Sequence, residues 1–165
     1  MVKFKVRDVY RALEANGFEH LREEWTADDM DGVIRGGCVL QQAGMNLGVV
    51  VGGEDEDDSN SLLRKLDALG QVPSNSKWVV SEYGSSPTIG EAIIYWNDKY
   101  EWVYNPKTQR DERRYALKTY KQVAKMAYDL LEPYMDKSIT LKEKDWNYKR
   151  KKGAAPFELK VEAAV

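Results

Sequence analysis

Apolar residues recur at helical spacing along most of the chain, and this pattern predicts a mainly helical protein. The first helix is expected over about residues 8 to 16, and Gly17 follows it, where helices commonly end in glycine. The same spacing predicts a helix that opens after Gly36-Gly37-Cys38. Another is expected to begin at residue 60 or 61.

The segment that begins at Thr88 carries the clearest helix signals. Thr88 and Glu91 have the spacing of a capping box, in which each side chain satisfies a backbone amide of the first turn. Apolar residues then follow at helical spacing as far as Trp96. Asn97-Asp98 is expected to end this helix, because both side chains can hydrogen-bond to nearby backbone.

The longest helix is predicted over roughly Asp111 to Glu132, with its apolar face best defined from Ala116 to Leu131. Pro133 ends it. Before it, aromatic residues at positions 100, 102 and 104 alternate with others, which predicts a short extended piece or one arm of a hairpin.

The expected fold class is therefore mainly α. Residues 1–135 are predicted to form one small helical domain with at most a short β-hairpin near Trp102. Residues 136–165 are predicted to form a basic C-terminal helix and tail. A chain of 165 residues is most simply one domain, and it is long enough to bury a core without a metal or a disulfide.

Composition narrows the classes of function. The single cysteine rules out an internal disulfide, and the single histidine excludes the usual Cys/His zinc sites. The longest apolar run, Leu47 to Val51, is too short to span a bilayer, so no membrane partner is expected. The N-terminus lacks the apolar region of a signal peptide. The cytoplasm is therefore the expected location, or the host cytoplasm if a phage encodes the protein, and a place in a virion is left open.

Charge is distributed unevenly along the chain. Residues 1–82 carry 15 acidic and 9 basic side chains, whereas residues 83–165 carry 12 acidic and 16 basic ones. Such polarity can orient a partner electrostatically. The alternative is that both kinds of charge simply cover solvated surface.

Cys38 is the first candidate for chemistry. It follows two glycines and precedes a predicted helix, where the helix dipole lowers the pKa of a thiol. His20 is the one side chain that could serve as its base in a thiol-dependent hydrolase. The alternative is that Cys38 is a small buried residue at a tight helix start, and that His20 lies on the surface or caps a helix.

Two acidic clusters raise the question of a metal. Neither Asp28, Asp29 and Asp31 nor the run from Glu54 to Asp58 has the spacing of a calcium loop. No glycine-rich segment has a Walker or dinucleotide-binding pattern. We therefore expect no metal and no cofactor.

Three further segments could bind a ligand or partner. Lys142 to Lys152 mixes basic residues with aromatic ones, as single-stranded nucleic-acid binders do, but an isoelectric point near 5.6 argues against this as a main activity. Trp96, Asn97 and Asp98 could line a small-molecule or nucleotide site, or could simply end a helix. Trp102 completes the candidate binding residues.

Four motifs in this order resemble an uncharacterised domain family found in actinobacteria and their phages. They are Gly17-Phe18, Gly37-Cys38, the Trp96-Asn97-Asp98 box and the helix from Thr119 to Ala127. The resemblance covers residues from about 6 to 131. It departs from the family at Phe18, where the family has Trp, and in a longer spacer after Asp98. It implies a small, mostly helical domain and a phage origin, and it implies no reaction.

The function expected from these observations is that of a small non-enzymatic accessory protein, encoded by a phage, that binds a host or phage protein. No catalytic constellation is complete, while the aromatic residues and polarised charge suit an interface. A thiol-dependent hydrolase that uses Cys38 and a small-molecule or nucleotide binder remain the alternatives.

Overall fold

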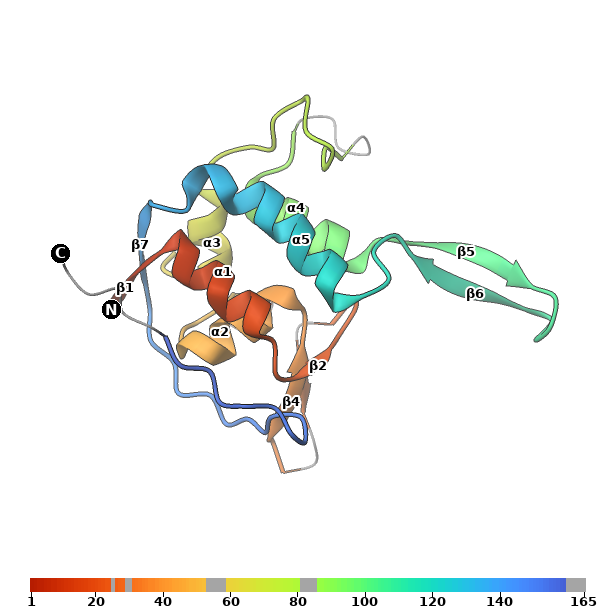
Figure 1. The fold of residues 1–165 in the computed structure, drawn as a ribbon, viewed down its shortest axis with the longest axis horizontal. Helices are drawn as coiled ribbons and strands as arrows, with labels where there is room; N and C mark the ends of the chain where they lie inside the picture. The colour runs from red at the N-terminus through yellow and green to blue at the C-terminus, as the bar shows by residue number, and fades with distance from the viewer. Residues whose placement is uncertain (25, 29–30, 53–58, 81–85, 160–165) are drawn as a thin grey trace.

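The computed structural model describes residues 1–24, 26–28, 31–52, 59–80 and 86–159, and it shows a mixed α/β fold (Figure 1). The expectation of a mainly α protein is therefore wrong, because short strands form three small sheets between and beside the helices. The helices are α1 (Val6–Ala15), α2 (Val39–Leu47), α3 (Leu62–Asp67), α4 (Ile89–Asp98), α5 (Tyr120–Leu131) and the 3-10 turn η1 (Glu132–Tyr134). The strands are β1 (Val2–Lys5), β2 (Glu19–His20), β3 (Thr26–Asp28), β4 (Ile34–Gly37), β5 (Tyr100–Asn105), β6 (Arg110–Tyr115) and β7 (Ser138–Leu141).

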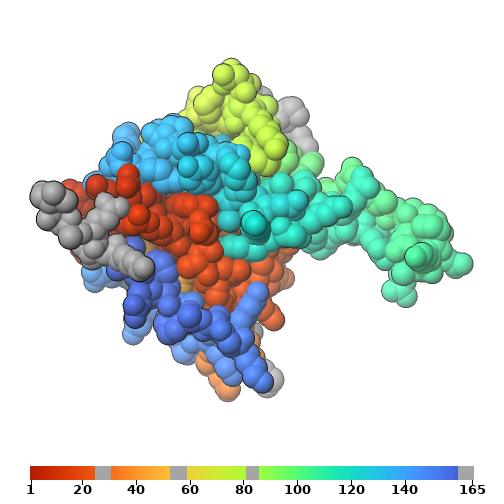
Figure 2. All heavy atoms as spheres, viewed as in Figure 1, coloured from red at the N-terminus to blue at the C-terminus, as the bar shows by residue number. Residues whose placement is uncertain are grey.

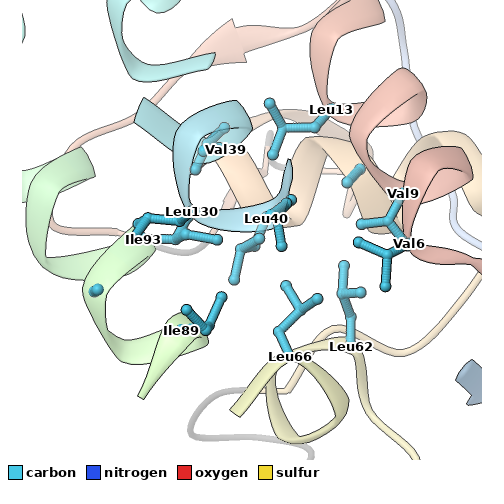
Figure 3. Packing of buried hydrophobic residues seen from close by; sticks show 14 of the residues in the cluster. Val6, Val9, Leu13, Val39, Leu40, Leu62, Leu66, Ile89, Ile93 and Leu130 are labelled. Atoms are coloured by element: carbon cyan, nitrogen blue, oxygen red, sulfur yellow. The ribbon is translucent and has the colours of Figure 1, made fainter. Parts of the chain in front are cut away.

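The helices enclose the hydrophobic core (Figure 3). Helix α1 packs against α2 and α5, and α4 packs against α3 and α5, so that the apolar faces meet in the centre. The side chains drawn there include Val6, Leu13, Leu40, Leu66 and Ile93, and each is fully buried. Burial of this apolar surface is the main force that holds the helices together.

The three sheets lie in different parts of the fold and connect different segments of the chain. Strands β1 and β7 pair antiparallel and bring the N-terminal strand beside residues 138–141. Strand β4 lies between β2, to which it is parallel, and β3, to which it is antiparallel, and it leads into α2. Strands β5 and β6 form a hairpin that projects from the body (Figure 1). We call this hairpin the arm.

The arm overturns the prediction of one helix from Asp111 to Glu132. Residues 110–115 form β6 and pair along their whole length with β5, and α5 begins only at Tyr120. Thr119 and Gln122 form a capping box that fixes this start. The segment before it alternates in side-chain direction, as a strand does, and has no apolar face that a helix could bury.

The C-terminal segment also differs from the prediction. Within the described part of residues 136–165, a strand, β7, takes the place of the predicted helix. The chain then runs in extended form beside β4 and α2, where the Lys149 amide donates to the Ile34 carbonyl and the Trp146 indole donates to the Val49 carbonyl. Among the described helices, none is both long and apolar enough to cross a membrane.

Candidate interaction site

Cys38 lies at the start of α2, as predicted, but the protein seals it inside the core. Only 3% of the residue is exposed. Burial raises the pKa of the thiol to about 12, and the backbone amides of Leu40 and Gln41, which favour the thiolate, offset this only in part. A thiol that stays protonated near neutral pH and has no access to solvent is a poor nucleophile.

His20 is engaged elsewhere. Its Nε2 lies 2.7 Å from Oδ1 of Asn97, and its ring meets the edge of the Tyr120 ring at a centroid distance of 4.9 Å. Burial lowers the pKa of His20, and the hydrogen bond with Asn97 opposes this shift. The described contacts therefore join His20 to Asn97 rather than to Cys38, and they give no support to a Cys–His pair.

Asn97 is fully buried at the end of α4, and all its side-chain polar atoms have partners. Its Oδ1 accepts from the Val39 amide at 3.3 Å, in addition to its contact with His20. Its Nδ2 donates to the Leu21 carbonyl at 3.1 Å and to Oδ1 of Asp98 at 2.7 Å. The residue thus ties α4 to β2 and to the first turn of α2, and it leaves no polar atom for a ligand.

Trp96 also makes contacts within the folded body of the protein. Its indole donates to the Trp78 carbonyl at 2.9 Å, and the two rings meet edge to face. Trp78 in turn donates to Asp129 of α5 at 3.0 Å.

The two cavities described nearby, of about 370 and 360 Å³, are lined by other residues, the first at the base of the arm and the second between Trp78 and α5. Neither of these two cavities has Trp96, Asn97 or Asp98 in its lining.

Trp102 lies in a different environment, on the arm. It is 60% exposed, and Tyr104 beside it is 59% exposed. In the space-filling view the arm stands out from the body, with solvent on several sides (Figure 2). The register places Trp102 opposite Arg113, and Tyr100 opposite Tyr115. Since side chains alternate along a strand, these residues share one face of the arm, which we call the aromatic face.

Arg113 organises the aromatic face. Its guanidinium lies 4.9 Å from the ring centre of Tyr100 and 5.4 Å from that of Trp102. It also forms an ion pair of 2.6 Å with Glu23, which belongs to the body. The rings and the cation are thus held together by stacking and by a charge contact at the root of the arm.

The segment from Leu21 to Glu23 fixes the base of the arm. Arg22 donates to the Asn97 carbonyl at 2.8 Å and to the Leu117 carbonyl at 2.6 Å, and its guanidinium covers the Tyr115 ring at 4.5 Å. The Glu23 amide donates to Asp98 at 2.8 Å. The Asn97-Asp98 pair therefore joins the body to the arm. The sequence pattern did not single out Arg22 or Arg113, and the five consecutive charged residues of β6 give no alternation that could have marked Arg113.

The aromatic and basic residues of the segment from Lys142 to Lys152 also make contacts within the folded protein. Trp146 donates its indole proton to the body, and the Lys144 ammonium lies 4.1 Å from the centre of its ring. Arg150 of the same basic segment covers the Phe18 ring at 4.8 Å. Among the described residues, no group of three His, Cys, Asp or Glu side chains could hold a metal ion. Asp29 and the run from Glu54 to Asp58 lie outside those residues, in the ranges 29–30 and 53–58.

Comparisons with protein-family models, with curated proteins and with solved structures found no match for this chain. The resemblance to an actinobacterial and actinophage domain family therefore stays a prediction.

Proposed function

We propose that this chain is a non-enzymatic accessory protein, encoded by a phage, that binds a host or phage protein in the host cytoplasm through the aromatic face of its arm. The observation that carries the proposal is the exposure of Trp102 and Tyr104 on a projecting hairpin. Exposed aromatic residues in a soluble environment have an unfavourable contact with water, and covering them by a partner removes it.

The composition of the aromatic face supports a protein partner. Tryptophan, tyrosine and arginine are the residue types that contribute most to binding energy at protein interfaces. Here Trp102, Tyr104 and Arg113 occur together on a short stretch. Glu23 and Tyr100 hold Arg113 in place before binding, which reduces the side-chain entropy that association would otherwise cost.

The experiment introduces a photo-crosslinking amino acid at position 104 and, as a control, at Tyr148. Tyr148 is also exposed, at 39%, but it lies in the C-terminal segment. Cells of an actinobacterial host that express each version are irradiated, and crosslinked proteins are identified by mass spectrometry. We expect one protein other than the chain itself to crosslink from position 104 and not from position 148.

The captured protein is then purified, and its Kd is measured by calorimetry. The double variant Trp102→Ala, Tyr104→Ala is expected to bind at least about 30-fold more weakly, the loss that corresponds to one hot-spot residue or more. Tyr148→Ala is expected to leave the Kd unchanged. Equal crosslinking from both positions, or unchanged binding by the double variant, would remove the arm as the contact surface.

A further inference from the structure

The two long edges of the arm are free in the described structure, since β5 and β6 have each other as their only neighbours there. The Ala116 amide donates to the Lys99 carbonyl at 2.9 Å, which makes these two residues a hydrogen-bonded pair. Antiparallel pairs alternate, so the backbone groups of residues 101, 103 and 105 point toward β6. Those of Tyr100, Trp102 and Tyr104 therefore point outward along the β5 edge.

The two edges differ sharply in charge. Five of the six residues of β6 are charged, whereas β5 contains Glu101 as its one charged residue. Charged side chains on an edge strand oppose the addition of another strand, and their absence permits it. A hairpin of two strands is also marginally stable alone in water, and a third strand or a packed surface stabilises it.

We infer that the β5 edge pairs antiparallel with the β5 edge of a second copy of this chain, which joins two arms into a four-stranded sheet. A two-fold axis through such a sheet places one β5 residue directly opposite the same residue of the second copy. With the axis at Trp102, the two Trp102 side chains face each other and Tyr100 faces the second copy's Tyr104. With the axis at Val103, Trp102 faces the second copy's Tyr104. Both arrangements form cross-strand aromatic pairs, which stabilise sheets.

The charges favour this edge over the other. On β5, Glu101 faces Val103 or Asn105 of the second copy in these two registers, so no carboxylate meets another. On β6, an axis at any residue from 110 to 114 sets a charged side chain directly against an identical one, because all five are charged. Like charges directly opposite destabilise a pair of strands. Antiparallel pairing with a second copy is therefore favourable along the β5 edge and unfavourable along the β6 edge.

This inference goes beyond the proposed function and does not depend on it. Strand pairing uses the backbone at the edge of β5, while the proposed partner contacts side chains on the aromatic face. A four-stranded sheet would present two aromatic faces side by side, which doubles the available contact surface.

The experiment is sedimentation velocity on the purified chain over a range of concentrations, where we expect a reversible dimer. Tyr104→Pro removes an outward amide from the β5 edge and keeps every hydrogen bond to β6. We expect it to weaken the dimer at least about tenfold, a loss of about 1.4 kcal/mol. Asp111→Pro is the matched control, since Asp111 lies directly across the arm from Tyr104 and its amide points outward from β6. It should leave the dimer intact.

Two further variants keep the test decisive. Tyr104→Ala retains the amide, so it should weaken the dimer less than Tyr104→Pro. A cysteine placed at position 102 or 103, one at a time, should form a disulfide between copies on oxidation when the axis lies at that residue, whereas Arg113→Cys on β6 should not. Circular dichroism checks that each variant is folded.

A wild-type chain that stays monomeric at every concentration overturns the inference, as does equal weakening by the two proline variants. Crosslinking from position 113 but not from 102 or 103 would also overturn it. A monomer would leave the proposed function standing, because that proposal is tested by contact with a different protein.

Discussion

The side-chain oxygen of Asn97 lies 2.7 Å from the imidazole of His20, although 77 positions separate the two residues in the chain. The same oxygen accepts from the Val39 amide at the start of α2. One buried side chain therefore joins the end of α4, the strand β2 and the start of α2. It does so beside Asp98 and Arg22, which orient the arm.

Asn97→Ala is expected to destabilise the protein strongly. The change leaves the His20 ring, the Val39 amide and the Leu21 carbonyl without their partner, and of these residues Val39 is fully buried while His20 and Leu21 are partly buried. A fully buried polar group that loses its partner costs about 1–3 kcal/mol, and a partly buried one costs less because water can reach it, so we expect a total loss of about 2–4 kcal/mol. Urea denaturation measures it. Asn75→Ala, at an exposed asparagine, should change the stability by less than about 0.5 kcal/mol. Equal effects at the two sites would refute a structural role for Asn97.

The burial of His20 predicts a pH dependence of stability. Burial lowers the pKa of His20 in the folded protein below its ordinary value of 6.5, and the charges of Arg22 and Lys151 act in the same direction. The unfolded chain therefore binds a proton more readily than the folded one. Stability is complete above the unfolded-state pKa and falls as the pH drops through it toward the lower folded-state pKa.

His20→Gln isolates this effect, because glutamine can still donate to Asn97 but does not titrate. We expect the free energy of unfolding of the wild type to fall between about pH 7 and pH 5, and the variant to lose much of that slope. Urea denaturation at each pH supplies the values. Identical slopes for the two proteins would show that His20 does not carry the dependence.

Local sequence signals located most helices of this fold. Gly17 and the capping box at Thr88 lie at the ends that the pattern predicts, because these signals depend only on neighbouring residues. Most short strands were not predicted, because their pairing depends on residues that are distant in the sequence. Strand β1 pairs with β7, more than 130 residues away, and a run of four residues in either strand does not indicate its partner.

The residues of the candidate site also differ in how far the sequence could predict them. The exposure of Trp102 follows from alternation in a hairpin arm, which the sequence indicated. The burial of Asn97 depends on partners at positions 20, 21 and 39, which no local pattern can identify. Arg113 was assigned to a helix, and its place on the aromatic face became visible only once β6 was paired with β5.

Cys38 should resist alkylation in the folded protein. Its thiol is buried and has a pKa raised to about 12, so thiolate is scarce near pH 7. We expect incubation with iodoacetamide at neutral pH to modify it slowly, and unfolding in urea to accelerate the reaction by orders of magnitude. Mass spectrometry of the intact chain follows both. Rapid modification of the native protein would restore the hypothesis of a thiol-dependent hydrolase.

Gly44→Ala should destabilise the protein although alanine favours helices more than glycine does. A Cβ at Gly44 would lie 2.0 Å from a methyl group of Val51, which is itself buried. Relief of such a contact shifts packed neighbours, and overpacking typically costs about 1–3 kcal/mol. This exceeds the helix preference of about 1 kcal/mol that alanine brings.

A double-mutant cycle with Val51→Ala tests the cause of that loss. Val51→Ala alone should destabilise the protein by creating a cavity, but it removes the methyl group that the new Cβ meets. In that background Gly44→Ala should become neutral or stabilising, and urea denaturation should show a favourable coupling energy between the two sites. If Gly44→Ala destabilises equally in both backgrounds, the close approach of α2 to Val51 is not what requires glycine at this position.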